Sequence, residues 1–150
     1  MTSGIIKITI SGLACLSLIS CVTAPTPASP PNRALIEAYT AAFNMQNVSA
    51  MATMMHPDIQ WITVAAGSSS VTTDGKTKMV AEMGDYFGGS TKVTSTLGGW
   101  GINGAFVSAV ETASWTSASG AKKAQSSNVV YQIDDGLIRR VWYFPEQPAQ

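Results

Sequence analysis

The feature that most constrains the fold is a series of alternating segments in the second half of the chain. Residues 105–116, 123–133 and 137–144 are rich in β-branched and aromatic side chains that alternate with polar or small ones, which is typical of strands with one buried face. Asp134-Asp135-Gly136 separates the last two segments and is a strong signal for a tight hairpin. A further strand is expected over 92–97. The pattern predicts a meander of antiparallel strands joined by short turns.

The first half of the chain predicts helices before and between strands. Apolar residues recur at helical spacing over 32–47, and a second short helix is expected over 48–55 and a third over 74–87. Residues 59–64 predict a strand, and the small polar residues of 65–73 predict a loop. This order of elements predicts an α+β fold with helices packed on one face of an antiparallel sheet.

The beginning of the chain is predicted to be a targeting signal rather than part of the folded domain. Residues 1–20 have a basic start, an apolar middle and a small-residue end, the order of a secretory signal peptide. Leu18-Ile19-Ser20-Cys21 resembles the bacterial lipoprotein box, which implies cleavage before Cys21 and lipid attached to its sulfur. Cleavage after Ala24 is the alternative. With cleavage before Cys21, residues 21–31 would be a lipidated cysteine with a proline-rich linker, and residues 32–150 would be the folded domain.

The lipoprotein resemblance also implies a location and a partner. Acyl chains on Cys21 would hold the exported domain at a bilayer. Val22 stands where an aspartate would favour the inner membrane, so we expect the periplasmic face of the outer membrane. The membrane is thus the expected partner, reached through the anchor.

Composition argues against several other classes of function. Nine basic residues balance nine acidic ones, so nothing favours nucleic acid as a partner. Both cysteines lie in the first 21 residues and the chain has one histidine, so neither a disulfide nor a metal site is expected in the domain. No nucleotide-binding loop or nucleophile elbow is present in the sequence, and we expect no cofactor.

Four stretches together resemble the nuclear transport factor 2-like superfamily, which includes the SnoaL-like, or polyketide-cyclase-like, proteins. They are the opening helix, MMHPDIQW, DGKTKMVAEMGDYF and the ending IDDGLIRRVWYF, over about residues 32–144. The resemblance implies a curved sheet wrapped around a long helix, forming a cone with a pocket inside, and a homodimer through the sheet. Members include isomerases, dehydratases, cyclases and epoxide hydrolases as well as non-catalytic domains, so the fold leaves the function open.

Strand register predicts which side chains line that pocket. Pairing Ile133 with Ile138 across the hairpin places Tyr131 opposite Arg140. The face carrying these last two residues is the more aromatic one, so we assign it to the concave side. The expected ligand-binding residues are Trp61, Tyr131, Arg140 and Trp142. The two tryptophans would either stack on a planar ligand or fill the cone.

Two carboxylates are the candidate catalytic groups. Glu111 lies mid-strand among small apolar residues on the predicted concave face, where a carboxyl group suits general acid–base chemistry. An ion pair with Arg140 and a surface position are the alternatives. Asp58 follows the only histidine, His56, near a strand start where members of the resembled family often carry an acidic residue. A structural role for both, with His56 capping carbonyls at a helix end, is the alternative.

The sequence therefore predicts an exported, lipid-anchored domain that binds a small apolar or aromatic molecule in its cone. One alternative is a SnoaL-like isomerase, dehydratase or hydrolase that uses a pocket carboxylate. The other is a dimeric, non-catalytic scaffold of the cell envelope.

Overall fold

The computed structural model describes residues 31–149, which form helices and one sheet. The helices are α1 (Pro31–Asn44), α2 (Val48–Thr53) and α3 (Lys76–Gly88). The strands are β1 (Met55–Ala65), β2 (Ser68–Asp74), β3 (Val93–Asn103), β4 (Phe106–Thr116), β5 (Lys122–Asp134), β6 (Leu137–Tyr143) and β7 (Gln147–Pro148). The predicted signal peptide, Cys21 and most of the linker lie outside the described residues. Within residues 31–149, no helix is long and apolar enough to cross a membrane.

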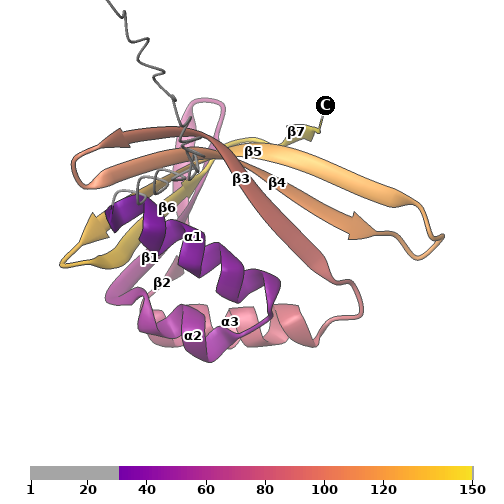
Figure 1. Cartoon of the computed structure of the whole chain (residues 1–150), viewed down its shortest axis with the longest axis horizontal. Coiled ribbons are helices and arrows are strands. Elements are labelled where there is room, and N and C mark those ends of the chain that lie inside the picture. Colours follow the sequence, from indigo (N-terminus) through magenta and orange to yellow (C-terminus); the bar gives the residue numbers. More distant parts are fainter. Residues whose placement is uncertain (1–30, 150) are drawn as a thin grey trace, which may run out of the picture.

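The strands form one curved sheet in the order β2-β1-β6-β5-β4-β3, and β7 pairs with β5. The pairs are antiparallel except β1 with β6, which is parallel. The three helices lie on the concave side of the sheet (Figure 1). The predicted α+β class and curved, cone-like architecture are confirmed. The homodimer through the sheet stays a prediction.

Two segments of the first half differ from the prediction. Most of the segment 65–73, expected to be a loop, belongs to strand β2 (Ser68–Asp74), which pairs with β1 and is exposed along nearly its whole length. An exposed edge strand does not show the apolar alternation by which strands are recognised in a sequence. Strand β1 begins at Met55 rather than near Ile59. Pro57 is tolerated there because the ladders to β2 and β6 skip its position.

The β5–β6 hairpin has the predicted turn. Asp135 and Gly136 both have positive φ, 49° and 74°, as a two-residue turn of this hand requires. Ile133 pairs with Ile138, as predicted.

The register beyond that first pair differs from the prediction. Arg139 is an extra residue in β6, so Gln132 pairs with Arg140 and Tyr131 pairs with Val141. Such a β-bulge sets two residues of one strand against one of the other. The prediction that Tyr131 lies opposite Arg140 is therefore wrong, and the side chains of β6 beyond the bulge point to the opposite faces from those expected.

The core lies between α1 and the concave face of the sheet. Ile36, Tyr39 and Ala42 are buried and lie three residues apart, so they share one face of α1. Opposite them, the central strands contribute the buried side chains of Val107, Ala109, Val129, Tyr131 and Val141. This packing holds α1 beneath the middle of the sheet.

We predict that Val141→Ala lowers the free energy of unfolding by about 2 kcal/mol, because it removes two buried carbons and leaves a cavity. Val71→Ala makes the same change on β2 at a residue that is 50% exposed, and should cost less than about 0.5 kcal/mol. Urea denaturation measures both. Equal losses would contradict the placement of Val141 in the core.

Candidate functional site

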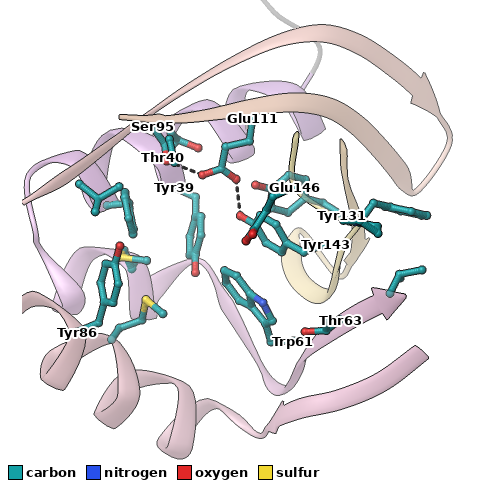
Figure 2. A pocket seen from close by; sticks show the side chains of 18 of the residues that line it. Tyr39, Thr40, Trp61, Thr63, Tyr86, Ser95, Glu111, Tyr131, Tyr143 and Glu146 are labelled. Carbon is teal, nitrogen blue, oxygen red and sulfur yellow. Dashed lines mark hydrogen bonds between the residues drawn. The ribbon is translucent and has the colours of Figure 1, made fainter. Parts of the chain in front are cut away.

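A cavity of about 480 Å³ lies between the helices and the concave face of the sheet. Figure 2 shows side chains from the helices and from several strands converging on it. Its lining is formed by Tyr39, Thr40, Phe43, Met51, Trp61, Thr63, Val64, Ala65, Met83, Tyr86, Val93, Ser95, Glu111, Ala113, Tyr131, Tyr143, Phe144, Pro145 and Glu146. An apolar, largely aromatic cavity with a few convergent polar groups is the usual form of a small-molecule site.

Glu111, in the middle of β4, accepts two hydrogen bonds at the wall of this cavity. The Ser95 hydroxyl donates to its Oε1 atom and the Tyr143 hydroxyl to its Oε2 atom (Figure 2). Ser95 comes from β3 and Tyr143 from β6, so the carboxylate joins strands on both sides of β4 and β5. Both bonds are charge-assisted and hold the carboxylate in one orientation.

Helix α1 fixes the position of Ser95. The side-chain amide of Asn44 donates to the Ser95 carbonyl at 2.8 Å, and its Oδ1 atom accepts from the Ser95 amide at 2.7 Å. This two-bond clamp joins the end of α1 to β3. The residue that orients Glu111 is thus itself held by a helix.

Tyr143 belongs to an aromatic and hydroxyl cluster. Its ring stacks on that of Trp61, with centroids 4.5 Å apart and planes 7° from parallel. Its hydroxyl also interacts with that of Tyr131. Burial is the largest cause that raises the pKa of Tyr131 and Tyr143 well above the ordinary value, so both hydroxyls keep their protons near neutral pH.

Tyr39 brings a polar atom with no partner to the cavity. Its side chain is buried, and its hydroxyl makes no hydrogen bond within the described part of the chain. Figure 2 shows the ring extending into the cavity on the side where Trp61 and Tyr86 lie. A buried hydroxyl without a partner is costly, and Tyr39 is among the residues that line the cavity.

Three of the predicted site residues are brought together. Glu111, Tyr131 and Trp61 all line the cavity. The ion pair between Glu111 and Arg140, which was the alternative to a catalytic role, is not formed between these described residues. Arg140 lies on the outer face of the sheet, where its guanidinium donates to Gln60 at 3.0 Å and to Gln132 at 2.9 Å.

Trp142 is on that outer face as well. Its ring centroid is 6.3 Å from that of Phe106, a residue that is 45% exposed. The prediction that Arg140 and Trp142 line the cavity is therefore wrong, and the reason is the extra residue Arg139. Their inward-facing neighbours Val141 and Tyr143 take the expected places.

Asp58 lies outside the cavity. Its carboxylate is 70% exposed and has an Arg139 nitrogen at 3.7 Å. The backbone amide of Asp58 donates to Nδ1 of His56 at 3.0 Å. His56 is inside β1, not at a helix end, so it caps no helix. In residues 31–149, no three His, Cys, Asp or Glu side chains are grouped as metal ligands.

Sequence reasoning missed Ser95, Tyr39 and Tyr143. Tyr39 shares the inner face of α1 with Ile36 and Ala42, a periodicity that is visible in the sequence. Tyr143 was missed because the predicted register turned its neighbour Trp142 inward instead. Ser95 carries no local signal, since its role comes from a contact across the sheet.

We predict that Tyr39 makes the protein less stable at alkaline pH. Burial, and next the charge of Glu111, raises the pKa of Tyr39 above its ordinary value of 10.0. The folded hydroxyl keeps its proton where the unfolded chain loses it. The stability it contributes is complete below pH 10 and is lost as the pH rises towards the folded-state pKa.

The free energy of unfolding in urea at about pH 8, 10 and 11 measures this effect in wild type and Tyr39→Phe. From pH 10 to 11, the wild type should lose up to about 1 kcal/mol more than the variant. Parallel curves for the two proteins would contradict the assignment.

Comparison with solved structures supports the fold. A Delta 5-3-ketosteroid isomerase from Mycobacterium sp. has a TM-score of 0.63 and 17% identity, covering 77% of this chain and 92% of that one. An LEH-like epoxide hydrolase from M. tuberculosis has 0.62 and 16%, covering 76% and 81%. A cystatin fold protein from Novosphingobium aromaticivorans has 0.62 and 19%, covering 76% and 97%. At these identities the likeness shows the fold alone.

Comparison by sequence gives the family. A search of curated proteins found no significant match. The model of the SnoaL-like domain, however, matches residues 36–141, which is more than half of the chain. The chain therefore belongs to the SnoaL-like domain family.

Proposed function

We propose that this SnoaL-like domain binds a small, mainly apolar, ring-containing molecule in its cavity. The observation that carries the proposal is a 480 Å³ aromatic cavity that holds two polar groups from different elements, the Glu111 carboxylate and the Tyr39 hydroxyl. The size suits a ligand of one to a few rings. The rings of Trp61 and Tyr143 offer aromatic surface, and stacking on such surface favours planar molecules.

The two polar groups define how the ligand is oriented. Glu111 only accepts hydrogen bonds, so it selects a donor group on the ligand. The Tyr39 hydroxyl both donates and accepts, and pairing it would remove the cost of its unsatisfied burial. We expect these two groups to decide which way round the molecule enters, because most of the other lining residues are apolar and Glu146 is exposed.

Native mass spectrometry of the protein as it occurs in its own cell envelope tests the proposal, with a non-covalently bound mass as the readout. We predict a reproducible extra mass on the wild type, reduced at least about tenfold in occupancy in Trp61→Ala and Glu111→Gln. Trp142→Ala is the matched control, since that ring lies outside the cavity. Circular dichroism verifies that each variant is folded. A wild-type protein without extra mass, even after incubation with envelope extract, would contradict ligand binding.

A second candidate is proton-transfer catalysis with Glu111 as the general base. The observation in its favour is that a carboxylate, held by two hydroxyls, shares the cavity with the free Tyr39 hydroxyl. A base and a hydrogen-bond donor are the groups needed to remove a proton next to a carbonyl. The fold neighbours described as an isomerase and an epoxide hydrolase are consistent with catalysis on this scaffold.

Deuterium exchange next to the carbonyl of a cyclic ketone, followed by NMR in D₂O, tests catalysis. We predict that the wild type accelerates exchange and that Glu111→Gln lowers this rate by about two orders of magnitude or more. Glu37→Gln, on the outside of α1, should not change it. Equal rates in the wild type and Glu111→Gln would exclude Glu111 as the base.

We also propose that the protein is exported and anchored through lipid on Cys21, at the periplasmic face of the outer membrane. Support comes from the signal-like residues 1–20, the box that ends at Cys21 and the proline-rich linker. We predict that the wild type sediments with membranes and that Cys21→Ser moves to the soluble fraction. A Cys21→Ser protein that stays membrane-bound would contradict the anchor.

A further inference from the structure

Among residues 31–149, all the charged side chains that line the cavity are acidic. Two carboxylates line it, Glu111 and Glu146, and in the described part of the chain no Lys, Arg or His does. Figure 2 shows the Glu146 side chain on the side of the cavity where Tyr143 and Glu111 lie. Glu111 is partly buried and Glu146 is exposed, so one carboxylate lies within the wall and the other lies nearer to solvent.

The arginines of the described residues are engaged elsewhere, and no lysine of this part of the chain lines the cavity. Arg33 pairs with Glu37 at 2.8 Å and lies over the ring of Trp100. Arg139 pairs with Asp134 at 2.8 Å, and Arg140 is held by the glutamines of the outer face. Hydroxyl groups donate to Glu111, but they bring no opposite charge. The carboxylate charge in the cavity is therefore not neutralised by the residues around it.

Aromatic side chains form a large part of the remaining wall. Seven of the nineteen lining residues are aromatic: Tyr39, Phe43, Trp61, Tyr86, Tyr131, Tyr143 and Phe144. The face of an aromatic ring is electron-rich and attracts an organic cation, most strongly where water is excluded. The tyrosine hydroxyls are neutral near pH 7, so the glutamates supply the charge of the wall.

We infer that the ligand of this cavity is an organic ammonium ion, a small amine or quaternary ammonium group attached to an apolar ring. The inference rests on the proposed function, that the cavity binds a small molecule. An ammonium group would neutralise Glu111 and lie against aromatic rings, whereas an anionic ligand would be repelled by both carboxylates. A neutral ligand of the same shape would leave the charge of Glu111 without a partner.

Isothermal titration calorimetry of the full-length protein with three matched probes tests the inference. The probes are para-hydroxyphenyltrimethylammonium, its neutral shape analogue para-tert-butylphenol, and the anion para-hydroxybenzenesulfonate. We expect the cation to bind about tenfold or more tightly than the neutral analogue and the anion not to bind.

Variants identify the groups responsible. Glu111→Gln should reduce the preference for the cation over the neutral analogue to about threefold or less, while affinity for the neutral analogue is kept. Glu146→Gln should give a smaller reduction that salt abolishes, since an exposed charge is screened. Glu37→Gln is the matched control outside the cavity and should keep the full preference. Thermal unfolding confirms that each variant is folded.

The outcomes separate this inference from the proposed function. If the neutral analogue binds as tightly as the cation in the wild type, the ammonium inference is wrong and the binding site remains. An unchanged preference in Glu111→Gln would also overturn it, because the charge of that residue would then play no part. If none of the three probes binds, both the inference and ring-ligand binding in this cavity are contradicted.

Discussion

The pairing of β6 is the constraint on which the rest of the structure depends. This strand joins the two halves of the sheet, since it is parallel to β1 on one side and antiparallel to β5 on the other. Its extra residue, Arg139, turns Val141 and Tyr143 towards the helices. Without that bulge, Arg140 and Trp142 would face the cavity, and Tyr143, which donates to Glu111, would point to the outer face.

The position of Tyr143 in turn organises the cavity. Its ring supports Trp61 and its hydroxyl holds Glu111, while the Asn44 clamp brings Ser95 to the other carboxylate oxygen. The polar centre is thus assembled from α1, β3, β4 and β6. A carboxylate held by hydroxyls within aromatic walls suits either recognition of a cation or transfer of a proton. Both proposed functions depend on the negative charge of Glu111.

Much of the fold could be predicted from the sequence. The periodicity of 32–47 predicted α1, and the Asp-Asp-Gly turn predicted the last hairpin, because these depend on interactions between residues close in the chain. Strand β2 was missed since its residues are small, polar and exposed. In the site, Glu111, Tyr131 and Trp61 were predicted correctly to lie in the cavity. Arg140 and Trp142 were wrongly placed there, because the β6 bulge that turns them outward has no local signature in the sequence. Asp58 was proposed from the family resemblance, and its carboxylate is exposed on β1.

The sequence by itself determined the α+β class, the hairpin and the resemblance to the family, because turn chemistry and apolar periodicity act over a few residues. Only the tertiary structure decided which side chains share the cavity. The extra residue in β6 turns every later side chain of that strand to the face opposite the one predicted. The two hydrogen bonds of Glu111 join residues 16 and 32 positions apart, so they exist only once the strands are paired.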